Sequence, residues 1–245
     1  MAILRRTMAL LLAASLACIV AGGCGGPSDP DESSWRREVD SSLESLRGSE
    51  AFRYRIHLET WVGVSGQSVY GDEKGDGAYD AGEYSVSITR TSPAGEESLA
   101  VAYSDDEMML QENGVWRLIS AEEAPSPLYD PQHFIDLVSA YGSLSLEGEE
   151  EIAGQISRRY LLQLSSDRAR DSLSTSAWSY FSPLAYELNC RIWVGDDAFP
   201  SSLQLEVVGF DPQERLQRYH LLATLEPFDI DTPGIQPITP PAAPE

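Results

Sequence analysis

Residues 71–83, GDEKGDGAYDAGE, carry acidic side chains at a spacing that could bind calcium. The first, fifth, sixth and twelfth places of a twelve-residue EF-hand loop are occupied by Asp72, Asp76, Gly77 and Glu83. Such a loop lies between two helices and holds the ion through oxygen ligands. The spacing alone therefore raises a calcium site as one interpretation of this stretch.

Two features of the same stretch argue against calcium. Lys74 stands at the third place of the loop, where an oxygen should bind, and its ammonium group would repel the ion. The flanking sequences, WVGVSGQSVY and EYSVSITR, are strand-like rather than helical. We therefore expect a hairpin connection and no metal site, with turn dihedrals of positive φ at Gly71, Gly75 and Gly77.

The sequence shows no constellation of residues that would perform catalysis. Its histidines, His57, His133 and His220, are scattered, and no H-E-x-x-H, G-x-S-x-G, C-x-x-C or Walker sequence occurs. His57 and His220 take outward positions in alternating segments, as surface histidines do. Acidic residues are so numerous that any pair of them is best interpreted as solvating. We expect a protein without enzymatic activity and without a cofactor.

Cys24 is a candidate for lipidation. Arg5 and Arg6 precede an uncharged apolar run, Met8 to Ala21, which is shorter than the roughly 20 residues of a membrane-spanning helix. A positive start followed by a short apolar run is typical of a cleaved export signal. The small residues before Cys24 resemble a bacterial lipobox, so we expect this cysteine to become a lipid-modified N-terminus. The alternatives are an ordinary signal with an incidental cysteine, or modification at Cys18.

Cys190 is then the other thiol of the mature chain, so no disulfide can form within it. In YELNCRIWV it falls on the apolar side of an alternating segment. We expect a buried, unreactive thiol rather than a reactive one.

The formal net charge of -22 excludes several classes of partner. Nucleic acid and anionic lipid surfaces repel such a chain. Attachment to a membrane must then come from the acyl chains, and two or more of these hold firmly. The expected location is the outer face of the cell membrane, after export. The sequence leaves any protein partner unidentified.

Hydrophobic periodicity predicts helices at two places. In SSWRREVDSSLESLRGS, one apolar stripe is formed by Trp35, Val39, Leu43 and Leu46. PQHFIDLVSAY, residues 131–141, has the same helical spacing and a proline suited to a first turn.

Between and after these helices the period changes to two. The predicted strands are AFRYRIHLETWV, EYSVSITR, ESLAVAYS, EMMLQ, VWRLI, ISRRYLLQLS, AYELNCRIWVG, SSLQLEVVGF and RYHLLATLEPF. Their short connections require antiparallel pairing. The polar segment 165–182 is either a helix or a lid-like insertion. The order predicts an α+β fold around a single curved antiparallel sheet.

We divide the chain into four parts on composition. These are a lipoprotein signal peptide at 1–23, a flexible tether at 24–34, one domain at 35–230 and a Pro-rich tail at 231–245.

This organisation resembles the LolA-like superfamily of cell-envelope proteins, and within it the LppX/LprG-type lipoproteins. The local features behind the resemblance are the opening helix before FRYRIHLE, GDGAYDAGEYSVSI, VAYSDDEMMLQENGVWRLI, RIWVGDDAFPSSLQLEV and TLEPFDIDTPGIQPITPP. It extends over residues 33–240. It implies a half-barrel whose concave face is covered by helices and holds acyl chains.

We therefore expect a membrane-anchored lipoprotein that binds or carries a lipid or an acylated ligand in an apolar cavity. The alternative is a sensory or structural lipoprotein with a filled core that binds a protein. The residues expected to line the cavity are Phe52, Tyr54, Ile56, Leu58, Tyr84, Val86, Ile88, Leu99, Val101 and Tyr103.

Overall fold

A computed structural model describes residues 32–64, 67–152, 154–172, 185–210 and 217–240. The predicted signal peptide, Cys24 and most of the tether lie outside the described residues. The first described helix begins at Glu32, so residues 32–34, which we assigned to the tether, are helical.

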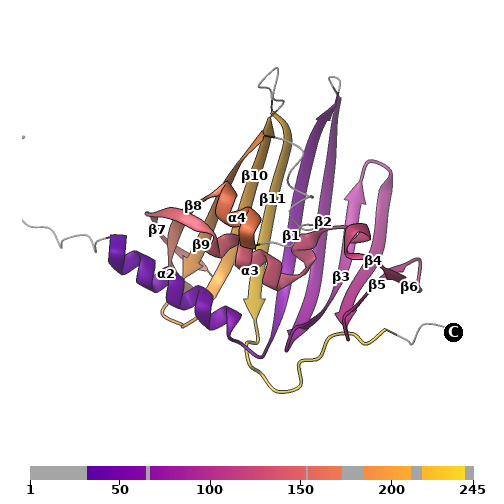
Figure 1. The fold of residues 1–245 in the computed structure, drawn as a ribbon, viewed down its shortest axis with the longest axis horizontal. Coiled ribbons are helices and arrows are strands. Elements are labelled where there is room, and N and C mark those ends of the chain that lie inside the picture. The colour runs from indigo at the N-terminus through magenta and orange to yellow at the C-terminus, as the bar shows by residue number, and fades with distance from the viewer. Residues whose placement is uncertain (1–31, 65–66, 153, 173–184, 211–216, 241–245) are drawn as a thin grey trace, which may run out of the picture. The chain divides into compact units, whose positions relative to one another are not determined.

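The described residues form one antiparallel sheet of eleven strands (Figure 1). The strands follow the order β6-β5-β4-β3-β2-β1-β11-β10-β9-β8-β7, and the sheet does not close. Their bounds are β1 Ala51–Val64, β2 Gln67–Asp80, β3 Glu83–Ser92, β4 Gly95–Ser104, β5 Glu107–Glu112, β6 Val115–Ile119, β7 Tyr141–Ile152, β8 Gln155–Leu164, β9 Ala185–Val194, β10 Pro200–Phe210 and β11 Gln217–Phe228. The predicted single antiparallel sheet is confirmed.

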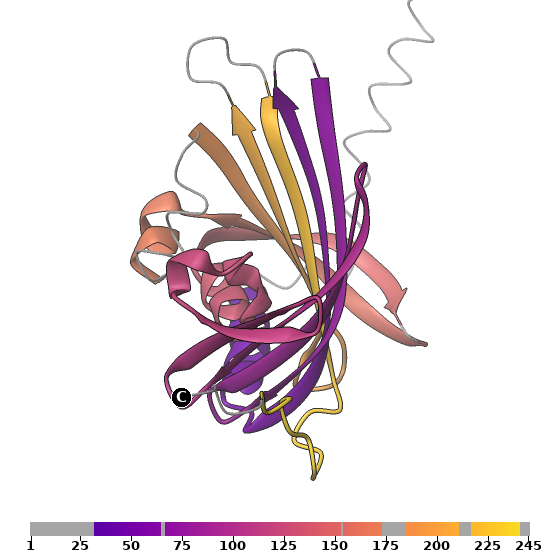
Figure 2. The same ribbon diagram turned by 90° about the vertical axis from the view of Figure 1, so that its right-hand side faces the viewer.

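The helices lie on the concave side of this sheet (Figure 2). Their bounds are α2 Glu32–Arg47, η1 Ala121–Glu123, η2 Pro127–Tyr129, α3 Pro131–Ser139 and α4 Ser166–Ser172. Helix α2 packs against β7, β9 and β10, and α3 packs against β8 and α2. The buried stripe of α2 is the one that the periodicity predicts, with Val39, Leu43 and Leu46 in the core. The α+β fold with helices over the concave face is thus confirmed.

Helix α3 begins as its sequence predicts and ends earlier. Asp130 is the N-cap and accepts a hydrogen bond from the Gln132 backbone N–H at 2.8 Å. The helix ends at Ser139, and Tyr141 is already the first residue of β7. We did not predict β7, because its sequence YGSLSLEGEEEI is mostly polar and resembles an exposed loop. Of the polar segment 165–182, residues 166–172 form α4, and residues 173–182 lie outside the described residues.

The hairpin connection that we predicted within residues 71–83 is present, but its turn lies at the end of this stretch and not at the three glycines. Residues up to Asp80 belong to strand β2, and the turn is confined to Ala81 and Gly82, with φ of 48° and 99°. The glycines at 71, 75 and 77 are paired residues of the strand and do not have positive φ. They serve packing instead of a turn, as the next section describes.

The predicted Pro-rich tail is irregular over its described part, but it is docked on the sheet. The Asp231 carboxylate accepts hydrogen bonds from the backbone N–H groups of Glu50 at 2.9 Å and Ala51 at 3.3 Å. Further along, the Ile238 N–H donates to Ser85 Oγ at 2.7 Å, and Ile235 is buried. The tail therefore holds the start of β1 and the outer side of β3.

Candidate functional site

The ten residues predicted to line a cavity lie on one face of the sheet. Strand register places them on β1, β3 and β4, with Tyr84 opposite Tyr103 and Ile88 opposite Leu99. All except Tyr103 are buried, at 6% exposure or less, and Tyr103 is half-buried. The structure thus brings all ten together on the concave side that the helices cover. Their role in holding a ligand stays a prediction.

The lower part of this face, at the end of the sheet where β1 begins, is filled by protein side chains. Phe134 and Val138 of α3 belong to the same core cluster as the sheet residues. Tyr54 is completely buried, and its hydroxyl donates to the Tyr129 carbonyl oxygen at 2.9 Å. Phe52 stacks on Tyr79 with ring centroids 5.0 Å apart. This part is an ordinary packed core.

Glycines on the inner face of β2 show where the filled region ends. A Cβ at Gly77 would overlap the ring of Tyr54, and one at Gly75 would overlap Ile88 and come within 2.8 Å of the Ser87 carbonyl oxygen. A Cβ at Gly71 would meet no atom of the described residues within 4 Å. Among these residues, the concave face is therefore occupied at the lower two glycines and open at the upper one.

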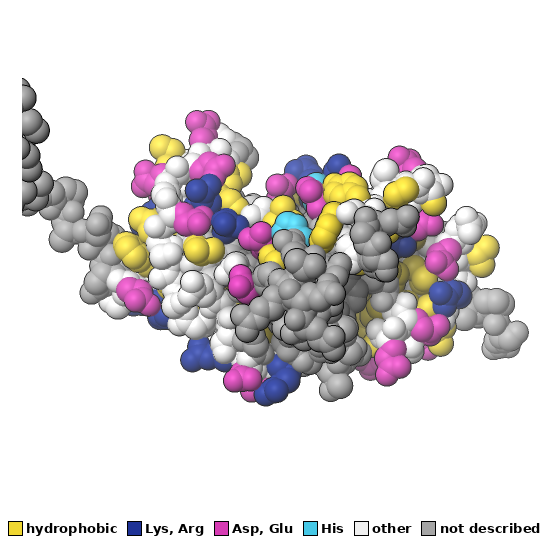
Figure 3. Space-filling view, turned by 90° about the horizontal axis from the view of Figure 1, so that it is seen from above, with side chains coloured by type: hydrophobic (Ala, Val, Ile, Leu, Met, Phe, Trp, Pro, Cys, Tyr) yellow, Lys and Arg dark blue, Asp and Glu magenta, His cyan; other side chains and the backbone are white. Residues whose placement is uncertain are grey.

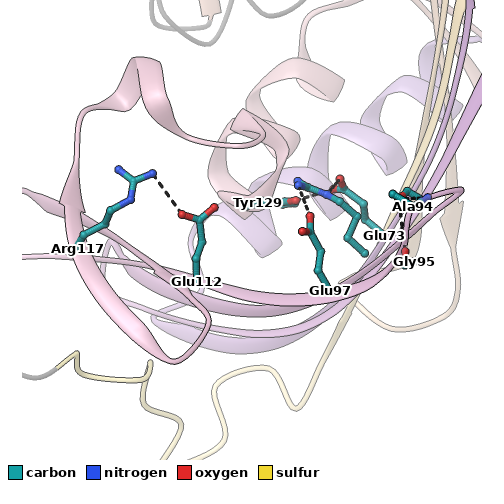
Figure 4. A network of polar contacts seen from close by, with 9 residues as sticks. Glu73, Ala94, Gly95, Glu97, Glu112, Arg117 and Tyr129 are labelled. Atoms are coloured by element: carbon teal, nitrogen blue, oxygen red, sulfur yellow. Dashed lines mark hydrogen bonds and ion pairs between the residues drawn. The ribbon is translucent and has the colours of Figure 1, made fainter.

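A polar group marks the boundary between the filled and open parts (Figure 4). We call it the rim cluster: Glu73, Arg90, Glu97 and Tyr129. Arg90 donates through Nε to Glu73 at 2.6 Å and through Nη1 to Glu97 at 2.9 Å. The Tyr129 hydroxyl donates to the other Glu73 oxygen at 2.5 Å. Register places Glu73 between Gly75 and Gly71, opposite Leu58 on β1.

The rim cluster is partly shielded from water, since Glu73 is 18% exposed and Arg90 is 30% exposed. Burial and the neighbouring Glu73 carboxylate raise the pKa of the Tyr129 hydroxyl, which therefore stays protonated and remains a donor. Sequence reasoning missed this cluster. The feature of the sequence that could have revealed the cluster is the charge of Glu73, which interrupts the run of inner-facing glycines on β2.

Above the rim cluster the inner face is less covered. Thr60 and Val62 are half-buried, and Val69, opposite Val62, is 55% exposed. On the other face of the same strand Tyr70 is 49% exposed. Seen from above (Figure 3), hydrophobic side chains gather at this end among acidic and basic groups. This end of the sheet therefore presents apolar surface next to an open inner position.

A second arginine lies on the same face, nearer the edge of the sheet. Arg117 on β6 is 3.5 Å from carboxylate oxygens of both Glu112 and Glu123. It is about half exposed, so these pairs contribute little stability. Within the described ranges, no group of three or more His, Cys, Asp or Glu side chains could hold a metal ion.

The residues of the calcium interpretation do not converge. Asp72 and Asp80 are separated by eight steps of an extended strand, roughly 26 Å, and Glu83 pairs with Asp80. Asp72 lies on the convex face, where His57 contacts it at 2.5 Å and Lys74 at 2.9 Å. Burial is the largest single influence on Asp72 and opposes its ionisation, but the hydrogen bonds and charges of Lys74 and His57 together outweigh it and lower the pKa of Asp72.

The remaining predicted residues lie as follows. His57 and His220 are on the convex face, where His220 contacts Glu206 at 3.1 Å, and His133 is on α3. Cys190 is buried on the inner face of β9, opposite Leu205, as the alternation predicts, and burial raises the pKa of its thiol. Among the helices that the structure describes, none is long and apolar enough to cross a membrane.

Comparisons with known proteins relate the fold to solved structures. No protein-family model and no curated protein matches the sequence. The crystal structure of LprF from Mycobacterium bovis matches with a TM-score of 0.50 at 12% identity, over 87% of this chain and 99% of that chain. The chain therefore shares the fold of LprF.

Two further structures match less closely. The lipoprotein LppX from Mycobacterium tuberculosis gives a TM-score of 0.47 at 12% identity, over 84% of this chain and 98% of that one. A lipoprotein-sorting domain from Vibrio parahaemolyticus gives 0.29 at 10% identity, over 82% and 94%.

Proposed function

We propose that this chain is an exported, membrane-anchored lipoprotein that binds a lipid or an acylated molecule on its concave face. The observation that carries the proposal is the change along β2 from filled to open space. Gly77 and Gly75 are covered by core side chains, whereas a Cβ at Gly71 would meet no atom of the described part of the chain within 4 Å. An acyl chain at the open end would lie above the rim cluster, against Thr60, Val62 and Val69.

The required affinity sets a lower limit on how much of the ligand is buried. Each buried methylene contributes about 0.8 kcal/mol, and micromolar binding needs about 8 kcal/mol. At least about ten methylenes must therefore leave water. A long acyl chain satisfies this requirement, and a short carboxylic acid does not.

Filling the open position tests the proposal. A Cβ at Gly71 meets no atom of the described residues within 4 Å, so Gly71→Phe should leave the fold intact. We expect this variant to bind a fluorescent fatty-acyl probe at least tenfold more weakly than the unchanged chain. Ser68→Phe is the matched control, because Ser68 lies on the same strand, is exposed and faces the convex side. Equal binding by the two variants would contradict the proposal.

A second function is favoured by a different observation. Nine of the ten residues that we expected to line a cavity are at most 6% exposed and belong to the packed core. This supports the alternative of a lipoprotein with a filled core that binds a protein partner. Native mass spectrometry of the chain made in a lipidating host separates the two. Co-purified lipid beyond that attached to Cys24 favours the carrier, and its absence together with unmeasurable probe binding favours the alternative.

The membrane anchor rests on Cys24 and has its own test. The apolar run and small residues before it support lipidation, and the net charge of -22 supports anchoring by acyl chains rather than by charge. Metabolic palmitate labelling should be lost in Cys24→Ser and retained in Cys18→Ser. Labelling that persists in Cys24→Ser would refute this assignment.

A further inference from the structure

The open sheet has two edges, and they differ in how they are protected. Its outermost strands are β6 and β7, and each leaves backbone N–H and C=O groups without a neighbouring strand. Such groups can pair with another extended chain unless charge, irregularity or a covering element prevents it. This difference between the edges does not depend on the concave face or its proposed ligand.

The β7 edge carries several protective features. Its pairing with β8 has two register shifts, at Tyr141/Ser143 and Leu146/Gly148. Helix α2 packs against it. Four of its residues, at 147 and 149–151, are glutamates. A regular strand could not pair along this edge without meeting bulges and a row of negative charges.

The β6 edge has none of these features among its described residues. Its five residues are VWRLI, and its pairing with β5 contains no register shift. Val115 is 67% exposed and Leu118 is 56% exposed. Branched and aromatic residues of this kind are the ones that pair well in sheets. A regular edge with exposed apolar side chains is the arrangement that accepts another strand.

The hairpin geometry shows which backbone groups are available. Asn113 and Gly114 both have positive φ, 53° and 80°, and form a two-residue turn that closes the hairpin at the pair Glu112 and Val115. Antiparallel pairs alternate between those that exchange hydrogen bonds and those that do not. The N–H and C=O groups of Trp116 and Leu118 therefore point away from β5, and these four groups can hold one added strand.

The charge around this edge determines the kind of strand that fits. Arg117 is the one basic residue in the segment 105–123. The same segment contains the acidic residues Asp105, Asp106, Glu107, Glu112, Glu122 and Glu123. A second copy of the chain, with its own net charge of -22, would be repelled. Symmetric pairing of two β6 strands would also place the two Arg117 side chains opposite each other.

We propose that the β6 edge binds an extended, basic segment of a partner protein as an added twelfth strand. Alternate residues of that segment are apolar and cover Leu118 on one face of β6, and the residues between them are Lys or Arg and face Glu112 and Glu123, which contact Arg117 on the other face. Main-chain hydrogen bonds provide the affinity, and the charge selects the partner.

The test uses the purified full chain and a synthetic peptide of alternating valine and lysine. Fluorescence anisotropy should show saturable binding that weakens as salt is added. Two control peptides separate the contributions. One carries N-methyl groups on alternate amides and keeps all charges, and the other has glutamate in place of lysine. Each should bind at least tenfold more weakly than the parent peptide.

A pair of variants tests the edge itself. Leu118→Pro removes an N–H that points away from β5, so no hydrogen bond to β5 is lost. Proline is tolerated at such a position, where an edge strand faces solvent. Leu118→Thr keeps the N–H and a strand-forming side chain. We expect at least tenfold weaker binding for Leu118→Pro than for Leu118→Thr.

Several outcomes would overturn the proposal. These are equal binding by the N-methylated and parent peptides, equal binding by the two Leu118 variants, and no binding of the parent peptide. If sedimentation shows that the chain dimerises and that Leu118→Pro abolishes the dimer, the partner at this edge is a second copy of the chain and not a basic segment. If Leu118→Pro does not fold, the N-methylated peptide decides the question with the unchanged protein.

Discussion

Replacing Gly77 with alanine tests the packing that ends the filled part of the concave face. The added Cβ would overlap three atoms of the Tyr54 ring. Tyr54 is completely buried, so its ring cannot move outward into solvent. Its displacement would also break the hydrogen bond from its hydroxyl to the Tyr129 carbonyl oxygen, now 2.9 Å long.

The size of the effect follows from three contributions. Overpacking a core costs about 1–3 kcal/mol. Leaving a buried carbonyl and hydroxyl without partners costs about 1–3 kcal/mol. Replacing glycine by alanine restricts the unfolded chain, which stabilises the folded state by about 0.4–1 kcal/mol. Taking the middle of each range, we expect Gly77→Ala to lower the free energy of unfolding by about 3 kcal/mol.

Gly71→Ala is the matched control on the same strand and the same face. Its Cβ meets no atom within 4 Å among the residues that the structure describes, so the restriction of the unfolded chain is the main effect. We expect this variant to be unchanged or more stable by about 0.5 kcal/mol. In urea unfolding followed by circular dichroism, the midpoints of the two variants should differ by about 1–2 M.

A double-mutant cycle makes the comparison specific to Tyr54. In a Tyr54→Leu background the ring is gone, and the cost of Gly77→Ala should fall to less than half. The reasoning is refuted if Gly77→Ala and Gly71→Ala unfold at the same urea concentration, or if the cost of Gly77→Ala is the same in both backgrounds.

Three further predictions concern buried polar groups. Burial raises the pKa of Asp130 above 3.8, its value in the unfolded chain. The folded state therefore loses stability as the pH rises from about 3.8 to the pKa of the folded chain. Asp130→Asn keeps the helix cap and removes the charge, so its melting temperature at pH 7 should be higher than that of the unchanged chain. This gain should disappear below about pH 4, and equal effects at both pH values would contradict the prediction. Cys190 is buried with a raised thiol pKa, so a thiol reagent such as DTNB should modify it only after unfolding, and rapid modification of the folded chain would contradict its placement. Tyr129→Phe removes one hydrogen bond from Glu73 and should lower the free energy of unfolding by about 1–2 kcal/mol in urea, whereas an unchanged midpoint would show that this bond adds nothing to stability.

Alternation within single segments was sufficient to predict most of the sheet. In β1 the residues at 52, 54, 56 and 58 are apolar and the residues between them are polar, and the first set is buried in the structure. Strand β9 places Cys190 inward for the same reason. These predictions succeed because apolar and polar residues alternate in a strand with one buried face, so its own sequence shows which face each side chain occupies.

Strand β2 could not be predicted in this way, because its inner residues are not apolar. They include Gly77, Gly75 and Gly71, and between them Glu73. The first two lack a side chain because Tyr54 and Ile88, from neighbouring strands, occupy the space. Glu73 is inward because Arg90 and Tyr129 satisfy its charge. In each case the residue type is explained by a side chain from another element. The sequence of β2 by itself therefore resembles a loop.

The sequence by itself determined the periodicities, and with them the helices, most of the strands and the inward orientation of the ten apolar residues. Its single lipobox-like cysteine and its charge of -22 also led to the proposed anchor. The tertiary structure alone decided that residues 71–80 are a strand, that a rim cluster joins β2, β3, β4 and η2, and that β6 is an unprotected edge. The physical reason is that periodicity reports which way a side chain points, whereas space, partners and edges depend on elements far apart in the chain.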